Sequence, residues 1–268
     1  MRRGIRFWLV ALVIAGLGLV GGTGVAQAAP AHEVKTKQVT GTITVSAAAS
    51  LTQAFTKMGT DFQKRNPGTT VKFNFGSSGT LAQQIQGGAP ADVFASADGA
   101  NMQKLVTAGQ VTAEPTVFAA NLLTIVVKPG NPKKVKSIAD LAKLDVDSLC
   151  GETVPCGKYA DQILSGVGVV IDPSHITRGA DVKTTLAAVT TGDADAAIVY
   201  VTDAKAAGTS VTAVPIPAWQ NAYAIYPIAP IAASTNQDLA NAWIEYTVSP
   251  AGQRTLRSFG FLPPPPTE

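Results

Sequence analysis

The sequence is poor in charged residues, and this scarcity argues against one large class of proteins. Charged residues make up only 15% of the 268 positions, and the formal net charge is +3. Nucleic-acid-binding proteins carry concentrated basic faces. The densest basic cluster here, Lys133, Lys134 and Lys136, stands beside Gly130 and Pro132 and fits a solvated turn. We therefore expect no nucleic acid as a partner.

The N-terminus has the layout of a secretory signal peptide. Arginines within the first six residues precede an uncharged apolar run over 7–20, and Ala26-Gln27-Ala28 offers an A-x-A cleavage site. An uncleaved anchor helix is the alternative, which the glycines of this region disfavour because they lower helix propensity. The region has no cysteine and so no lipobox. We expect export to the periplasm, cell envelope or exterior, with a signal peptide over 1–28 and a tether over 29–38.

Cysteine and histidine are both scarce. The only two cysteines, Cys150 and Cys156, lie six positions apart, and the two histidines, His32 and His175, are distant from them in sequence. A metal site would need more ligands nearby, whereas a close cysteine pair in an exported chain most often forms a disulfide. We expect a disulfide here. So small a ring restrains little chain entropy, so its expected role is to fix the shape of one loop.

Predicted strands and helices alternate after the tether. The hydrophobic patterns and stop signals predict strands over 42–47, 71–75, 92–96, 122–127 and 195–201, and helices over 51–64, 81–86, 101–108, 154–164, 182–191, 239–248 and 252–259. A capping box at Ser137–Asp140 predicts one more helix start, and the apolar stretch 222–232 predicts a return crossing. This order indicates an α/β fold with mostly parallel sheets covered on both faces. The length left after the signal, about 240 residues, is sufficient for one large domain or two small lobes.

Four predicted strand-to-helix junctions have the character of anion sites. They contain Ser50, Ser78, Cys156 and Asp181, and each presents free backbone N–H groups at the positive end of a helix. Ser50 is a predicted N-cap with Gln53 three residues later, and Asp181 is another predicted N-cap. Capping alone would explain any one of these residues. The set of four favours an anionic ligand.

The amino-acid sequences around these junctions resemble those of a known family. The segments are Ile43–Leu51, Phe75–Ile85, Gly88–Asp98, Val154–Gly157, Asp181-Val182 and Ala197–Ala204. Together they resemble the molybdate-binding proteins of ABC uptake systems, over nearly all of the chain from about residue 42 to residue 261. The resemblance implies a two-lobed periplasmic-binding-protein fold of type II, in which each lobe is a mostly parallel sheet flanked by helices. Two crossover strands would form the hinge, with 39–120 and 226–268 in lobe 1 and 121–225 in lobe 2.

The resemblance also implies a ligand set. Serine hydroxyls of Ser50 and Ser78 would contact the oxyanion from lobe 1, backbone amides of Cys156 and Val182 from lobe 2, and the hydroxyl of Tyr200 would complete the shell. Cys156 departs from the alanine that the family leads us to expect, but a backbone amide tolerates that change. A disulfide to Cys150 would brace the loop that supplies this amide. The molybdenum would be held only as the oxyanion, with no direct protein–metal ligand and no cofactor.

The chemistry of the ligand agrees with this set. Molybdate at neutral pH is a dianion with four acceptor oxygens and no proton to donate, so a site of hydroxyls and amides offers only the donors it needs. Hydrogen phosphate would require a carboxylate acceptor, and none of the five implied positions is acidic. Asp181 is close, but as an N-cap its carboxylate is expected to bind local amides. An ordinary tyrosine at the edge of the core is the alternative for Tyr200.

The resemblance implies capture of molybdate, and of the nearly equal-sized tungstate, for the transmembrane subunits of an ABC permease. We expect a monomer. Another tetrahedral oxyanion, such as sulfate, is the nearest alternative. A serine hydrolase using Ser50 or Ser78 would need a G-x-S-x-G elbow and a base within reach, and neither is evident, since His175 lies in a predicted surface turn. We therefore expect that the protein is not an enzyme. A sensor or adhesion domain with the same fold is a third alternative.

Overall fold

The computed structural model of the chain describes residues 39–266. The predicted signal peptide and tether lie outside the described residues. Within residues 39–266, no helix is long and apolar enough to cross a membrane.

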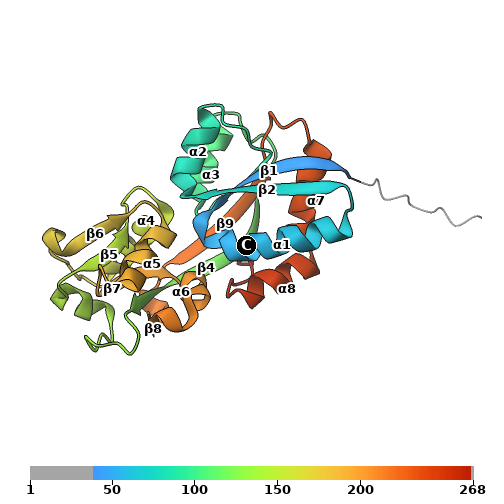
Figure 1. Cartoon of the computed structure of the whole chain (residues 1–268). Helices are drawn as coiled ribbons and strands as arrows, with labels where there is room; N and C mark the ends of the chain where they lie inside the picture. Colours follow the sequence, from blue (N-terminus) through green and yellow to red (C-terminus); the bar gives the residue numbers. More distant parts are fainter. Residues whose placement is uncertain (1–38, 267–268) are drawn as a thin grey trace, which may run out of the picture. The chain divides into compact units, whose positions relative to one another are not determined.

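All strands of the described residues belong to one mixed sheet (Figure 1). Its strand order is β2-β1-β3-β9-β4-β7-β5-β6, and β8 pairs with β4 off this path. The strands are β1 (Gly41–Ala48), β2 (Thr69–Gly76), β3 (Val93–Ala95), β4 (Thr116–Val127), β5 (Asp147–Cys150), β6 (Ile176–Gly179), β7 (Ala196–Tyr200), β8 (Thr212–Pro215) and β9 (Tyr223–Pro230). Strands β1–β3 pair in parallel, and so do β5–β7. Every antiparallel pairing involves β4 or β9.

Strand β4 connects the two halves of the sheet. Its first part, Thr116–Leu122, pairs with β9, and its second part, Leu123–Val127, pairs with β7. Figure 1 shows β4 and β9 running between two groups of helices and strands. The predicted two-lobed fold with two crossover strands is therefore confirmed, while the exact lobe boundaries stay a prediction.

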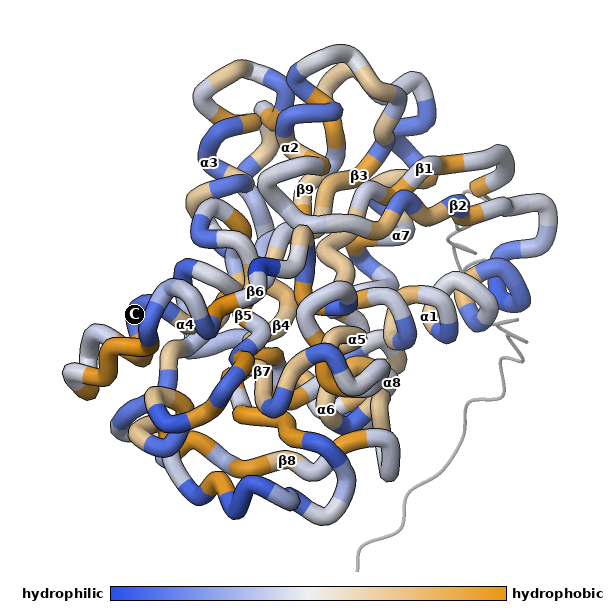
Figure 2. Tube along the Cα trace, turned by 60° about the vertical axis from the view of Figure 1, so that its left-hand side comes forward, coloured by the Kyte–Doolittle hydropathy of each residue, from blue (hydrophilic) through white to orange (hydrophobic). Residues whose placement is uncertain are grey.

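Helices cover the sheet in both lobes. The first lobe carries α1 (Thr52–Arg65), α2 (Ser78–Gln86), α3 (Gly99–Thr107), α7 (Gln237–Val248) and α8 (Pro250–Ser258), and the second carries α4 (Pro155–Gly166), α5 (Val182–Thr191) and α6 (Val201–Ala207). In Figure 2 the hydrophobic stretches follow the strands, and the hydrophilic ones gather in outer helix turns and loops. Helix α1 buries an apolar face. Its Phe55 and Phe62 pack edge-on against Trp243 of α7, with ring centroids 5.4 and 5.5 Å apart.

The structure corrects several local predictions. Strand β4 begins at Thr116, six residues before the predicted start, because pairing with β9 recruits a segment containing two alanines, which have low strand propensity. The capping box at Ser137 is present, but it opens a 3₁₀ helix, Ile138–Lys143. The short strands β5, β6 and β8 were not predicted, since four residues are too few to show a hydrophobic period.

Candidate functional site

The first lobe brings two serine-bearing loops to one edge of the sheet. Strands β1 and β2 are parallel neighbours, and their last residues, Ala48 and Gly76, are register partners. The chain therefore leaves both strands at the same edge. Ser50 lies in the 3₁₀ turn that follows β1, and Ser78 is the first residue of α2, which follows β2.

The second lobe repeats this arrangement. Strands β5 and β6 are parallel and end at the register partners Cys150 and Gly179. Helix α4 begins at Pro155 after the first strand, and α5 begins at Val182 after the second. Two helix N-termini thus lie at one sheet edge, where their unpaired N–H groups favour an anion.

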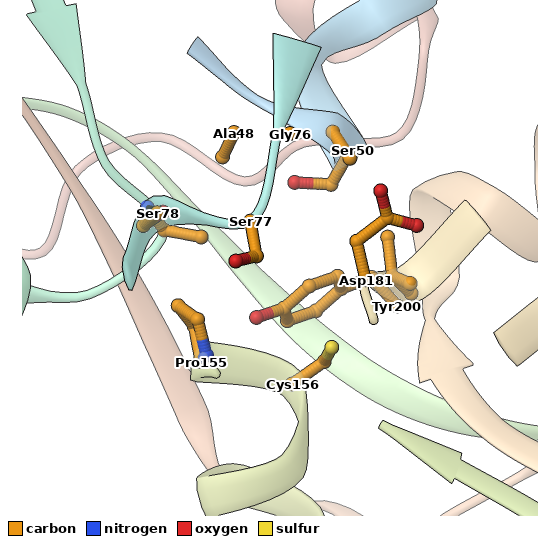
Figure 3. Close-up of a pocket in the computed structure, with 12 residues that line it drawn as sticks. Ala48, Ser50, Gly76, Ser77, Ser78, Pro155, Cys156, Asp181 and Tyr200 are labelled. Atoms are coloured by element: carbon orange, nitrogen blue, oxygen red, sulfur yellow. Dashed lines mark hydrogen bonds between the residues drawn. The ribbon is translucent and has the colours of Figure 1, made fainter. Parts of the chain in front are cut away.

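One small cavity of about 20 Å³ joins these elements. It is far smaller than the several hundred Å³ of a pocket for a drug-sized molecule. All five residues of the implied ligand set line it, together with Ala48, Ala49, Gly76, Ser77, Ala97, Pro155 and Asp181. Figure 3 shows the hydroxyls of Ser50, Ser77 and Tyr200 directed into the same space. The structure brings the predicted residues together, and their contact with an anion stays a prediction.

Ser50 does not cap the following helix, so that prediction was wrong. A 3₁₀ turn, Ala49–Leu51, separates β1 from α1, and the N-cap position falls on Leu51. The hydroxyl oxygen of Ser50 lies instead 2.9 Å from the hydroxyl of Tyr226 in β9. Ser50 is buried, with 4% of its surface exposed. Its side chain is thus free of any capping role and available at the cavity.

The hydroxyl of Ser78 is arranged as a donor. Its oxygen accepts a hydrogen bond from the backbone N–H of Ala97 at 2.9 Å, which leaves its own hydrogen unassigned. Ser77, which the sequence analysis did not single out, caps α2. It accepts from the N–H of Thr80 at 3.2 Å and donates to the hydroxyl of Thr80 at 2.9 Å. Ser77 is thereby engaged within its own helix turn.

Tyr200 has the most informative side chain of the cavity. It is the last residue of β7, it is 1% exposed, and its hydroxyl has no hydrogen-bond partner among the described residues. Burial raises the pKa of Tyr200 well above its ordinary value, so the group stays protonated and can donate. A buried tyrosine in an ordinary core normally finds a partner for its hydroxyl. The geometry therefore favours a ligand contact over a core-edge role.

The loop before α4 is fixed by a disulfide and a close backbone approach. Cys150 and Cys156 form the predicted disulfide, with the Cα atoms 5.7 Å apart. A Cβ added to Gly157 would lie 2.0 Å from the carbonyl oxygen of Gly151, so only glycine fits beside Cys156. Both features fix the position of Cys156, which lines the cavity.

Acidic groups near the cavity are engaged by other partners. Asp181 caps α5 as predicted, because its carboxylate accepts from the N–H of Thr184 at 2.9 Å. Asp98, 5% exposed, accepts from the N–H of Asn101 at 2.8 Å. Lys158 of α4 approaches Asp98 to 3.7 Å, and Lys183 of α5 lies 2.7 Å from Asp203. Within residues 39–266, no group of three or more His, Cys, Asp or Glu side chains could hold a metal ion.

Comparison with known proteins decides the family. Residues 43–262 match the family described as bacterial extracellular solute-binding protein. The chain belongs to this family. A curated relative of this solute-binding protein, the molybdate-binding protein ModA of Mycobacterium tuberculosis (strain ATCC 25618 / H37Rv), is 39% identical over 255 residues and covers 95% of each chain.

Solved structures agree on the fold of this solute-binding protein. The periplasmic molybdate-binding protein of Azotobacter vinelandii has a TM-score of 0.74 at 21% identity, covering 83% of this chain and 100% of its own. The sulfate-binding protein SubI of Mycobacterium tuberculosis H37Rv also has a TM-score of 0.74, at 22% identity, covering 83% of this chain and 86% of its own. At these identities the two structures show the shared fold alone.

Proposed function

We propose that this solute-binding protein captures molybdate or tungstate, as the dianion, in the cavity between its two lobes. Ser50, Ser78 and Tyr200 would donate hydroxyl hydrogens, and Cys156 and Val182 would donate backbone N–H groups. The anion would then be passed to the transmembrane subunits of an ABC permease outside the cytoplasm. We propose that the protein acts as a monomer and needs no cofactor.

The observation that carries this proposal is the buried, unpartnered hydroxyl of Tyr200 at the cavity. An unsatisfied buried hydroxyl costs about 1–3 kcal/mol, so a structure that keeps one needs a reason for it. An oxyanion acceptor supplies that reason. The hydroxyls and helix N-termini around it can all donate hydrogen bonds, which suits a ligand with four acceptor oxygens and no proton. The 39% identity to a molybdate-binding protein supports the choice of anion.

The arrangement also implies how anion binding is coupled to closure of the two lobes. The donors come from both lobes, and β4 and β9 link the lobes. An anion that bridges both sets of donors binds the closed arrangement better than an open one, so it shifts the population toward closure. The closed form would be the one that docks on the permease.

Thermal unfolding of the protein without its predicted signal segment tests the proposal. A ligand that binds only the folded state stabilises it by RT ln(1 + [L]/Kd), about 2.7 kcal/mol at one hundred times Kd. We expect molybdate and tungstate to raise the Tm, and equal concentrations of sulfate and phosphate to leave it unchanged. A shift with sulfate alone would point to a sulfate-binding protein. No shift with any anion, in folded and anion-free protein, would contradict the proposal.

A further inference from the structure

A buried chain of hydrogen bonds leads away from the cavity behind Ser50. The Ser50 hydroxyl lies 2.9 Å from that of Tyr226, and the Tyr226 hydroxyl lies 3.4 Å from Nδ2 of Asn121. The same Nδ2 donates to the Thr202 hydroxyl at 2.9 Å. Exposed fractions are 4% for Ser50 and Thr202 and 0% for Asn121 and Tyr226. We call these four residues the hinge relay, since Asn121 belongs to β4 and Tyr226 to β9, the two crossover strands.

The direction of each hydrogen bond in the relay is fixed by one backbone group. The N–H of Leu122 donates to Oδ1 of Asn121 at 3.0 Å. A backbone N–H can only donate, so the oxygen of the Asn121 amide must face Leu122 and its NH₂ must face the relay. An NH₂ group cannot accept a hydrogen bond. The Tyr226 oxygen is therefore an acceptor toward Asn121.

The rest of the polarity follows from this. Among the described residues, the remaining hydrogen-bond partner of the Tyr226 hydroxyl is Ser50. The Tyr226 hydrogen accordingly points at the Ser50 oxygen, and Ser50 keeps its own hydrogen for the cavity. Burial raises the pKa of Tyr226 far above its ordinary range, so that hydrogen stays in place. Ser78 reaches the same state by accepting from the N–H of Ala97.

We propose that Tyr226 and Asn121 are positioning residues that orient the Ser50 hydroxyl so that it donates its hydrogen to the anion. This inference rests on the proposed function, because it takes Ser50 to contact the anion. Because the Ser50 oxygen accepts from Tyr226, the Ser50 hydrogen is free to donate to the anion, whose oxygens are all acceptors.

A double-mutant cycle on Ser50 and Tyr226 tests the relay. The variants are Tyr226→Phe, Ser50→Ala and the pair together, with Tyr223→Phe, on the same strand but 46% exposed, as the matched control. Calorimetry gives the molybdate Kd of each variant. We expect Tyr226→Phe to weaken molybdate binding about tenfold, because the Ser50 hydroxyl then loses the partner that orients its hydrogen toward the anion. In the Ser50→Ala background, the same change should have almost no further effect.

The outcomes separate the relay from the proposed function. Wild-type protein that binds no molybdate contradicts the proposed function. If wild-type protein binds molybdate, then an unchanged Kd in Tyr226→Phe, or losses that add up in the double variant, overturn the relay. The Tm of each ligand-free variant verifies that it folds. Should Tyr226→Phe not fold, Asn121→Leu removes the donor that orients Tyr226, and wild-type affinity in that variant would equally overturn the relay.

Discussion

The ammonium of Lys183 lies 2.7 Å from Oδ1 of Asp203, a carboxylate that is wholly buried. The same ammonium donates to the side-chain oxygen of Gln53 at 2.9 Å. Lys183 belongs to α5 of the second lobe and Gln53 to α1 of the first, so this one side chain pairs a buried charge and spans the two lobes. It also stands next to Val182, whose amide we propose as a ligand.

We therefore expect Lys183→Met to lower both stability and affinity. Removing one partner of a buried ion pair leaves the other charge uncompensated, at a cost of about 3 kcal/mol in the free energy of unfolding. Losing the contact to Gln53 should also weaken molybdate binding, because the closed arrangement loses one link between lobes. Urea unfolding and calorimetry measure the two effects. The double variant Lys183→Met, Asp203→Asn should recover most of the stability, and a single variant as stable as wild type would contradict the pairing.

Replacing Tyr200 with phenylalanine should separate affinity from stability. Its hydroxyl has no partner among the described residues, so its removal breaks no hydrogen bond within the described protein. We expect the Tm of the ligand-free protein to stay the same or rise. A hydrogen bond to a charged group contributes about 1.5–3 kcal/mol, so the Kd for molybdate should increase about tenfold to a hundredfold. If Tyr200→Phe keeps wild-type affinity, Tyr200 is an ordinary core residue.

The disulfide is expected to brace the loop that supplies the Cys156 amide. Replacing both Cys150 and Cys156 with serine should lower the free energy of unfolding by about 2 kcal/mol. The reason is that the unfolded chain regains the conformational freedom that the small disulfide ring removes. Because the loop also loses its fixed shape, molybdate affinity should fall several-fold. Urea unfolding and calorimetry of the double variant and of the oxidised wild type give the comparison. Unchanged affinity together with unchanged stability would contradict the bracing role.

The close approach at Gly157 offers a sharp test of the same loop. A Cβ at this position would lie 2.0 Å from the carbonyl oxygen of Gly151, so Gly157→Ala must displace the start of α4 relative to Gly151 and disturb the loop at the cavity. We expect weaker molybdate binding and a lower Tm. Gly166 ends the same helix and has nothing within 4 Å of an added Cβ, so Gly166→Ala is the matched control. That control should bind like wild type, and similar affinities for both variants would count against the loop geometry.

Asp147 predicts how stability depends on pH. The residue is fully buried in β5, and neither carboxylate oxygen has a hydrogen-bond partner among the described residues. Burial, with a smaller contribution from the charge of Asp195, raises the pKa of Asp147 from 3.8 to about 7. Between these values the folded state holds a proton that the unfolded state releases. The free energy of unfolding should therefore fall as pH rises from about 4 to about 7, by about 4 kcal/mol if no other group titrates.

Asp147→Asn checks this assignment. The variant keeps the shape of the side chain and cannot ionise, so its stability should lack this fall with rising pH. At pH 7.5 it should be more stable than wild type, and at pH 4 the two should be similar. Urea unfolding across this pH range measures both slopes. Equal slopes for the two proteins would show that Asp147 titrates normally.

Much of the site could be predicted from the sequence because local chemistry defines it. Helix starts need caps and small residues, and Asp181 caps α5 as its position in the sequence predicted. The run from Ala196 to Tyr200 is apolar enough to predict a buried strand. The close spacing of Cys150 and Cys156 predicted the disulfide between them. These features depend on residues within a few positions of one another. The family resemblance then assigned a shared site to four separate junctions.

The tertiary structure decided what depends on contacts between distant segments. Ser50 and Tyr226 are 176 residues apart, and nothing in the sequence of either segment predicts a hydrogen bond between their hydroxyls. Ser50 reads as a helix cap in the sequence, and only the 3₁₀ turn before α1 turns it toward the cavity and Tyr226. The hydrogen-bonding state of Tyr200 likewise depends on everything packed around it. Local propensity determined where each junction lies, whereas the direction in which each hydroxyl can donate was decided by partners that only the folded chain brings within hydrogen-bond distance.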